Sequence, residues 1–318
     1  MTFRPLLRIL PDNTRIRFMR GRYLGLLVSA VLSTASIILF FHPGLNLGID
    51  FAGGVIVEAR TPAPADFGKI RAALAAEGVR TSGVQRFGNA DTVAVRLDAQ
   101  PSSAATDLMV TKVQTALQHA EPGTKILATS AVGPSVSAQL FRSGMLALGL
   151  SMLMILVYIW FRFEWEFAVG AVVTLTLDIT KAIGFLVLTR FDFDLVMIGA
   201  LLTILGYSTN DKVVVYDRMR ENLRKYKTMP LRDLIDLSIN ETLNRTIGTS
   251  MTVFLAALPL ALFGGSTLSG FAWVMLFGIV VGTSSSIYIA APILLLLGEG
   301  RLRRDAGTAA KAAKAAGS

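Results

Sequence analysis

The sequence predicts a polytopic α-helical membrane protein with six transmembrane helices and one small α+β domain inserted after the first helix. Of its 318 residues, 53% are apolar and only 17% are charged, whereas soluble globular chains have about 25% charged residues. The charges lie in blocks between long apolar stretches, and about 20 consecutive apolar residues cross a bilayer as a helix. Residues 42–140 interrupt these stretches with a mixed composition that is typical of a folded soluble domain.

Six apolar stretches are long enough to cross a bilayer as helices. We expect the first to be an uncleaved anchor, because its apolar run exceeds that of a secretory signal and no A-x-A-like cleavage site follows it. The stretches are Tyr23–Phe41, Phe141–Phe161, Trp165–Leu188, Leu195–Tyr216, Ile247–Phe263 and Phe271–Leu297.

The Lys/Arg distribution predicts the orientation, because cytoplasmic loops are enriched in these residues. Residues 1–22 hold six arginines and one acid, and further basic residues gather in the segment 217–246 and in the tail 298–318, which we expect to be disordered. Residues 42–140 hold eight basic and eight acidic residues. Both termini and the segment 217–246 are therefore expected in the cytoplasm, with the domain at 42–140 on the outer side.

The inserted domain has the pattern of four strands and two helices. Strands are predicted at Val55–Arg60, Val84–Phe87, Thr92–Leu97 and Lys125–Thr129, and helices from about Asp66 to Glu77 and over Ala104–His119. The order is βαββαβ, which is the split ferredoxin-like arrangement.

Composition excludes several kinds of site. The chain has no cysteine, so disulfides and thiolate metal sites are excluded, and His42 and His119 are too far apart in sequence to suggest a metal site. The net charge of +9 is explained by the topology, so no nucleic-acid partner is needed. No P-loop, G-x-S-x-G or H-E-x-x-H motif occurs, so we expect no enzyme activity and no cofactor, and ATP is not a direct energy source.

Ionisable residues within the apolar stretches are functional candidates, because burying a charge in a membrane is costly. Asp178 lies midway along the third stretch, and Thr174, Asp178 and Lys181 share one helix face. In the fourth stretch, Asp211 adds a second carboxyl, and the two acids near cations form a candidate proton relay.

The fourth stretch also holds Lys212, next to Asp211. Adjacent helix positions do not face each other, so Lys212 either extends to the cytoplasmic headgroups or turns inward to a carboxylate of the third stretch. Asp217 and Arg218 follow about two turns later. Because they suggest that the membrane exit is near, we expect Lys212 to snorkel to the headgroups.

Glycines mark two further features. Gly278 and Gly282 form a GxxxG pattern in the sixth stretch, which predicts close packing against a neighbouring helix. The run Gly48-Ile-Asp-Phe-Ala-Gly-Gly54 suits a tight reversal between the first helix and the first strand.

Several of these strings resemble the SecF family of protein-export membrane proteins. Gly48-Ile-Asp-Phe-Ala-Gly-Gly54 is similar to its G-I-D-F-x-G-G signature, which the partner family SecD shares. Gly206-Tyr-Ser-Thr-Asn-Asp211 with Val213-Val-Val-Tyr-Asp-Arg218 resembles its fourth-helix motif, and Ser238-Ile-Asn-Glu-Thr-Leu-Asn-Arg-Thr246 and Gly282-Thr-Ser-Ser-Ser286 are also similar. The resemblance extends from about Arg15 to Leu297.

The resemblance implies a multi-pass protein of the bacterial inner membrane, related to the resistance–nodulation–division transporters. Its partners would be SecD, the SecYEG translocon, YajC and translocating preproteins, and the proton-motive force would drive its assistance to export. It implies a proton-coupling role for Asp178. The proton-coupling candidates are Asp178, Asp211, Lys212, Lys181, Asn210 and Arg218. The structural-motif candidates are Gly48, Asp50, Gly53, Gly54, Gly206 and Asp217.

Two departures and two alternatives accompany this interpretation. The family commonly has His before the third-helix aspartate and a small residue after Asn-Asp, where this chain has Leu177 and Lys212. One alternative is half of a proton-driven small-molecule efflux transporter, which the small outer domain disfavours. The other is an intramembrane aspartyl protease with Asp178 and Asp211 as a shared-proton dyad, which the missing G-x-G-D motif disfavours.

Overall fold

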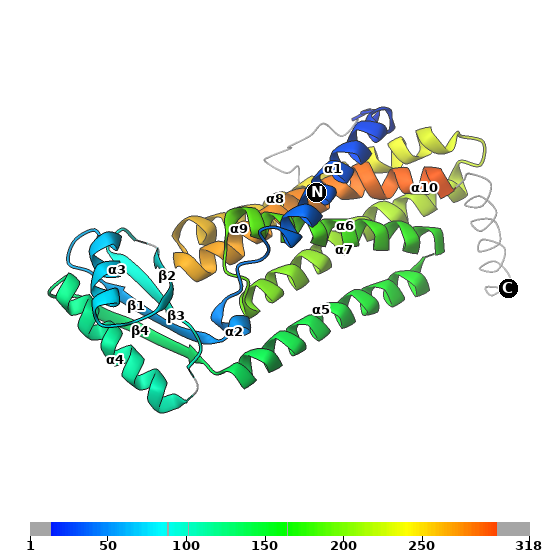
Figure 1. Cartoon of the computed structure of the whole chain (residues 1–318). Coiled ribbons are helices and arrows are strands. Elements are labelled where there is room, and N and C mark those ends of the chain that lie inside the picture. Colours follow the sequence, from blue (N-terminus) through cyan, green and yellow to red (C-terminus); the bar gives the residue numbers. More distant parts are fainter. Residues whose placement is uncertain (1–13, 88, 101, 164, 298–318) are drawn as a thin grey trace, which may run out of the picture.

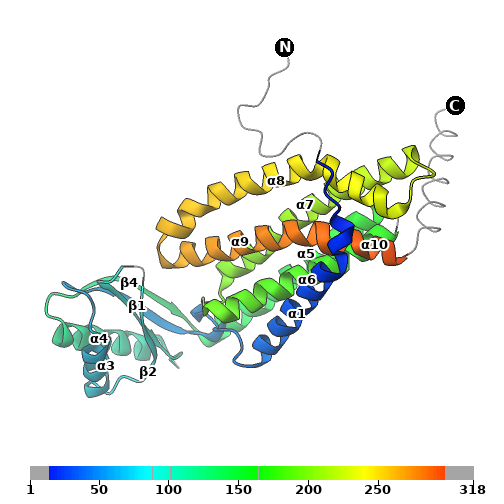
Figure 2. The same cartoon turned by 90° about the horizontal axis from the view of Figure 1, so that it is seen from above.

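The computed structural model describes residues 14–87, 89–100, 102–163 and 165–297. The chain forms an elongated bundle of long helices with a small α+β domain at one end (Figure 1). The segment η1 (Phe18–Gly21) and the last helix, α10 (Ala291–Leu297), lie at the opposite end of the bundle (Figure 2). The predicted tail 298–318 falls outside the described residues.

The bundle consists of helices that contain all six predicted stretches. They are α1 (Arg22–Phe41), α5 (Pro134–Arg162), α6 (Trp165–Thr189), α7 (Leu195–Lys225), α8 (Leu231–Phe263) and α9 (Gly265–Ser285), which continues through the π-helical turn η2 (Ser286–Ala290) into α10. Large apolar side chains remain exposed along α1 and α5, as expected of surfaces that face lipid rather than water.

Five of these segments are long and apolar enough to cross a membrane: Phe18–Phe41, Pro134–Arg162, Trp165–Thr189, Leu231–Phe263 and Leu268–Leu295. The chain is therefore a membrane protein. Helix α7, which contains the fourth predicted stretch, is not among the five. It is 31 residues long, but its polar run from Tyr207 to Lys212 and its charged end lower its hydropathy. Length and composition alone thus support five spans of the six expected.

The small domain contains the predicted strands and helices in the predicted order. Its elements are β1 (Gly54–Arg60), α3 (Phe67–Ala76), β2 (Thr81–Arg86), β3 (Thr92–Leu97), α4 (Ser103–Ala120) and β4 (Lys125–Val132). The strands form one antiparallel sheet in the order β2-β3-β1-β4. Asp66 caps α3 by accepting from the backbone N–H groups of Gly68 and Lys69, as an N-cap aspartate does.

The core of this domain lies between the sheet and its two helices. Val57 on β1, Val93 on β3, Ile70 on α3 and Val113 on α4 are fully buried in it. Because each helix contributes an apolar face to one side of the sheet, the sheet and the helices bury a single core.

The motif Gly48-Ile-Asp-Phe-Ala-Gly-Gly54 connects the domain to the bundle through the short helix α2 (Ile49–Ala52). Gly53 and Gly54 have φ of +72° and +124°, and a Cβ on Gly54 would lie 2.4 Å from the carbonyl oxygen of Leu97. A Cβ on Gly48 would lie 2.9 Å from Asp194. The glycines therefore serve the tight reversal that the sequence predicted.

The loop between α6 and α7 docks onto this junction. The Gly48 N–H donates to the Phe193 carbonyl at 2.9 Å, and the Phe193 N–H donates to the Asn46 carbonyl at 2.7 Å. The N–H of Leu195 donates to Asp50 at 3.1 Å. Arg96 of β3 forms an ion pair with Asp192 in the same loop. These contacts join the small domain directly to the two helices that carry the candidate acids.

Candidate functional site

The candidate site is a buried ion pair between α6 and α7. Thr174, Asp178 and Lys181 lie on one buried face of α6, as their spacing predicted. Lys212 of α7 is fully buried, and Asp178 is 1% exposed. The Lys212 Nζ lies 3.0 Å from Asp178 Oδ2.

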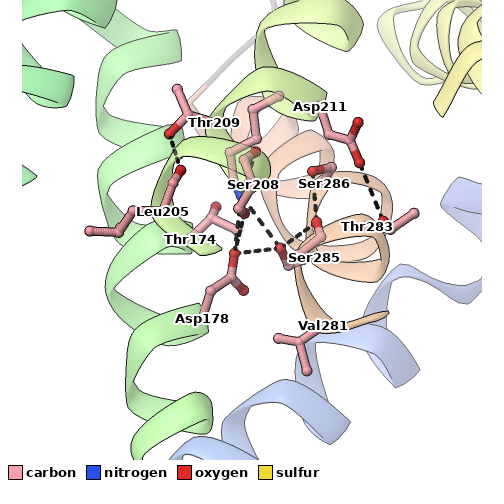
Figure 3. A network of polar contacts seen from close by, with 12 residues as sticks. Thr174, Asp178, Leu205, Ser208, Thr209, Asp211, Val281, Thr283, Ser285 and Ser286 are labelled. Carbon is pink, nitrogen blue, oxygen red and sulfur yellow. Dashed lines mark hydrogen bonds and ion pairs between the residues drawn. The ribbon is translucent and has the colours of Figure 1, made fainter. Parts of the chain in front are cut away.

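Two serine hydroxyls complete the environment of this carboxylate oxygen. Ser208 of α7 and Ser285 of α9 each donate to Asp178 Oδ2 at 2.8 Å, so three helices converge on one oxygen atom (Figure 3). The Lys212 ammonium also donates to the Ser208 hydroxyl and, at 3.4 Å, to the Ser208 carbonyl. Three donors therefore surround this one oxygen, and such hydrogen bonds offset part of the cost of burying a carboxylate.

The other carboxylate oxygen, Asp178 Oδ1, is different. It is buried and makes no hydrogen bond within the described part of the chain. The Lys181 Nζ lies 3.8 Å away from it. This distance is longer than a direct hydrogen bond and suits a bridging water. The Asp178 carboxylate therefore lies between two ammonium groups. Its Oδ2 accepts hydrogen bonds from Lys212, Ser208 and Ser285, whereas its Oδ1 accepts none in the described part of the chain.

The structure corrects the predicted position of Lys212, which does not snorkel. Helix α7 continues to Lys225, so Lys212 lies more than three turns from its end and cannot easily extend to a headgroup. Lys212 also follows Ser208 by four residues and so shares its face toward α6. The Asp178 carboxylate offsets the cost of burying the ammonium.

Asp211 has a separate environment, beside α9 and α8. Its carboxylate accepts a hydrogen bond from the Thr283 hydroxyl at 3.3 Å, and Thr283 shares a hydrogen bond of 2.8 Å with Ser250. Tyr207 donates to Ser250 at 2.6 Å. Figure 3 shows the Asp211 side chain directed toward Thr283 and away from Asp178.

This separation bears on the protease alternative. No hydrogen bond joins Asp178 to Asp211 among the residues that the structure describes. An aspartyl protease dyad needs two carboxyls within hydrogen-bond reach that share one proton. The arrangement therefore argues against a shared-proton dyad.

Three other candidates lie away from the ion pair. The side chain of Asn210 is exposed. Arg218 pairs with Glu241 at 2.7 Å and with Glu221, and Asp217 pairs with an arginine at the end of α5. These contacts brace the end of the bundle opposite the small domain.

The glycines of the fourth and sixth stretches have unequal roles. A Cβ on Gly278 would lie 2.4 Å from Ile204, and one on Gly282 would lie 3.1 Å from Ser208. The predicted close packing is therefore confirmed, and it brings Ser285 within reach of Asp178. By contrast, a Cβ on Gly206 would meet nothing within 4 Å, so close packing does not explain that glycine.

Comparisons with known proteins agree with these features. Residues 112–300 match the family described as protein export membrane protein SecD/SecF, C-terminal, and residues 38–61 match the SecD/SecF GG motif. The chain is 41% identical to the protein translocase subunit SecF of Cereibacter sphaeroides, over 95% of this chain and 94% of that protein. The chain belongs to the SecF family.

A second SecF relative and two solved SecDF structures are also similar to this chain. The SecF of Rickettsia prowazekii is 40% identical over 96% of this chain and 98% of its own. The crystal structure of SecDF, a translocon-associated membrane protein from Thermus thermophilus, matches with a TM-score of 0.82 and 32% identity over 91% of this chain. The super-membrane-facing form of SecDF gives a TM-score of 0.62. This chain spans 39% of the first of these SecDF chains.

Sequence reasoning missed the hydroxyl groups of this SecF site. The run Gly282-Thr-Ser-Ser-Ser286 was noted only as one of the strings similar to the family, and no contact with Asp178 was predicted for it. Ser285 does donate to the Gly282 carbonyl at 3.0 Å, but it also donates to Asp178. Ser208 could have been found, because it precedes Lys212 by one helical turn.

Proposed function

We propose that this chain is an auxiliary subunit of the Sec protein-export machinery that uses the proton-motive force, together with SecD, to assist translocation through SecYEG. Its relatives are named protein translocase subunit SecF, and the SecDF title describes a translocon-associated membrane protein. YajC and translocating preproteins are further partners in this proposal. The chain performs no chemical conversion.

The buried cluster around Asp178 carries this proposal. An ion pair buried between three helices has two discrete states, because protonation of Asp178 removes its charge attraction for Lys212 and weakens the hydrogen bonds from both hydroxyls. Moving one charge through 100 mV is worth about 2.3 kcal/mol. A difference of this size biases a two-state equilibrium by more than tenfold, so proton movement can drive a rearrangement of α6 against α7.

The loop that joins α6 to α7 offers a route to the small domain. Phe193 and Asp192 in this loop bond to Asn46 and Arg96 of the junction. A displacement of one helix against the other would therefore pull on the base of the domain. This connection supports a mechanism in which proton binding at Asp178 changes the position of the domain.

The proposal includes six spans, with α7 as the fourth. A helix that packs its charged face against α6 and α9 can lie within a bundle without an apolar outer surface. The strand order β2-β3-β1-β4 with its two helices supports a ferredoxin-like domain at 42–140. The proposal places this domain on the periplasmic side. A reporter fused after Ser103 should then read periplasmic, and fusions at Lys227 or Lys311 cytoplasmic. A cytoplasmic reading at Ser103 would contradict both the orientation and the export role.

The experiment that tests the export role is an assay of precursor processing in cells whose only SecF is this chain. We expect Asp178→Asn to accumulate unprocessed precursors while the variant still co-purifies with SecD. Asp217→Asn, which alters a surface ion pair that is 42–43% exposed, is the matched control and should process precursors normally. Normal processing by Asp178→Asn at wild-type protein levels would refute the proposal.

A further inference from the structure

An open pocket of about 460 Å³ lies between the end of α5 and the last turns of α7, at the end of the bundle opposite the small domain (Figure 1). All the residues that line it are charged. Four are basic and two are acidic, which gives the pocket a net charge of +2. They are Arg162, Arg220, Arg224 and Lys225, with Asp217 and Glu221.

This pocket lies at the level of lipid headgroups. Helices α5 and α7 both begin beside the small domain (Figure 1), and they have 29 and 31 residues. At 1.5 Å per residue they are about 44 Å and about 46 Å long, whereas a bilayer with both headgroup layers is about 40–45 Å thick. The pocket at their far ends therefore lies in one headgroup layer.

Exposed aromatic side chains confirm this level. Trp160 and Phe161 precede Arg162 at the end of α5, and Trp165 begins α6. They are 65%, 90% and 45% exposed. Aromatic residues, tryptophan above all, gather at membrane–water interfaces. The pocket is thus bordered by side chains that contact the lipid close to its headgroups.

Both acidic residues of the pocket already have cationic partners. Asp217 lies 2.9 Å from the guanidinium of Arg162. Glu221 pairs with Arg218, which does not line the pocket. The positive charge of the other basic residues is therefore not cancelled by these two carboxylates.

The remaining basic side chains are available to an anion. Arg224 and Lys225 are exposed, and neither forms an ion pair within the described part of the chain. The Lys225 Nζ lies 5.0 Å from the centre of the Tyr226 ring. Arg220 donates to the Arg162 carbonyl at 3.4 Å, which holds its guanidinium at the end of α5. The pocket thus combines guanidinium and ammonium donors from two helices.

We propose that this pocket binds the headgroup of an anionic phospholipid through its phosphodiester. Arginine binds phosphate oxygens with parallel hydrogen bonds, and lysine binds them as a point charge. Basic pockets between transmembrane helices at a membrane surface bind such headgroups. An acidic segment of a protein would also match the charge, but the exposed aromatic residues beside the pocket favour a ligand with acyl chains. The proposal goes beyond the export role and holds for either orientation of the chain.

The test is quenching of tryptophan fluorescence by brominated lipid, with the full chain reconstituted in phosphatidylcholine vesicles. The chain has three tryptophans, and Trp273→Phe leaves only Trp160 and Trp165, which border the pocket. A bromine on an acyl chain quenches a tryptophan that it approaches closely. Brominated phosphatidylglycerol is the anionic probe, and brominated phosphatidylcholine measures lipid contact without charge preference.

We expect phosphatidylglycerol to bind beside these tryptophans about fivefold more tightly than phosphatidylcholine. Arg224→Gln/Lys225→Gln should make the two affinities equal, and Arg224→Gln alone should lose part of the preference. The matched control is Lys227→Gln/Arg232→Gln. It removes the same charge from exposed residues of the segment 217–246 that do not line the pocket, so it should keep the preference.

Equal affinities for the two lipids in the protein with an intact pocket would overturn the proposal. A preference that survives Arg224→Gln/Lys225→Gln would also overturn it. If both double variants reduced the preference by the same factor, general surface charge rather than a pocket would be responsible, and the proposal would fail. Loss of the preference in the pocket variant alone would support it. None of these results depends on export activity.

Discussion

Replacing Lys212 by methionine should destabilise the bundle, because it leaves Asp178 buried without its closest cation. The charged atoms lie 3.0 Å apart, which corresponds to an attraction of about 5.5 kcal/mol at an effective dielectric constant of about 20. Removing one partner of a buried pair costs about 3–5 kcal/mol. Lys181 and two hydroxyls remain near the carboxylate, so we expect a loss near the lower limit, about 3 kcal/mol.

A double-mutant cycle isolates this interaction. The free energy of unfolding is measured by denaturant titration of the purified protein for Lys212→Met, Asp178→Asn and the double variant. The double variant leaves no unpaired charge at these two positions. Its loss of unfolding free energy should therefore be at least about 2 kcal/mol smaller than the sum of the losses of the two single variants. The exposed pair of Arg162 with Asp217 provides the control cycle, with an expected coupling below about 1 kcal/mol.

Additivity of Lys212→Met and Asp178→Asn within about 0.5 kcal/mol would refute the reasoning. It would mean that the two side chains do not depend on each other in the membrane. The cycle also tests the corrected position of Lys212, because a snorkelling lysine would lose little when it is replaced.

Two further predictions concern the junction of the small domain. Gly54→Ala should destabilise the domain by about 1–3 kcal/mol, because a Cβ there would lie 2.4 Å from the Leu97 carbonyl oxygen at φ +124°; Gly83→Ala, where a Cβ would meet nothing within 4 Å, is the control and should be near neutral. Thermal unfolding, monitored by trypsin cleavage within residues 54–132, measures the stability of both variants. Equal stability of the two variants would contradict the strain argument. Burial raises the pKa of Asp192, although the Arg96 guanidinium lowers it. Since the folded pKa lies above the unfolded one, protonated Asp192 favours the folded state at low pH, and this contribution is lost as pH rises through the folded pKa. Asp192→Asn should therefore flatten the dependence of stability on pH just above the ordinary aspartate pKa of about 3.9, and an unchanged slope in the same assay would count against this.

The sequence predicted those features that depend on periodicity. The strand predicted at Thr92–Leu97 has the bounds of β3, and helical spacing placed Asp178 and Lys181 on one face. The helix ends were less predictable. Helix α8 begins at Leu231 rather than near Ile247. Hydropathy detects the apolar part of a helix that crosses lipid, and it does not detect a polar extension of the same helix.

The position of Lys212 could not be read from its own helix. Whether a lysine snorkels or turns inward depends on the partner that a neighbouring helix presents, and that partner is 34 residues away in sequence. The same limit applies to Ser285, which lies 107 residues from Asp178. The sequence of a single helix does not determine such contacts between helices. The ion pair could therefore be predicted only as one of two outcomes for Lys212, an inward turn to a carboxylate or extension to the headgroups.

The most direct test of the central claim is proton-dependent export in inverted vesicles that contain SecD and SecYEG. Export of a preprotein is compared with and without an ionophore that collapses the proton gradient, for the wild type and for the variant Asp178→Asn/Lys212→Gln. This pair of changes keeps hydrogen-bonding groups in the cluster and removes both charges, so the variant should fold and associate with SecD. If Asp178 carries the proton, the variant loses the ionophore-sensitive part of export that the wild type shows. If the variant retains that part in full, Asp178 is not the proton carrier.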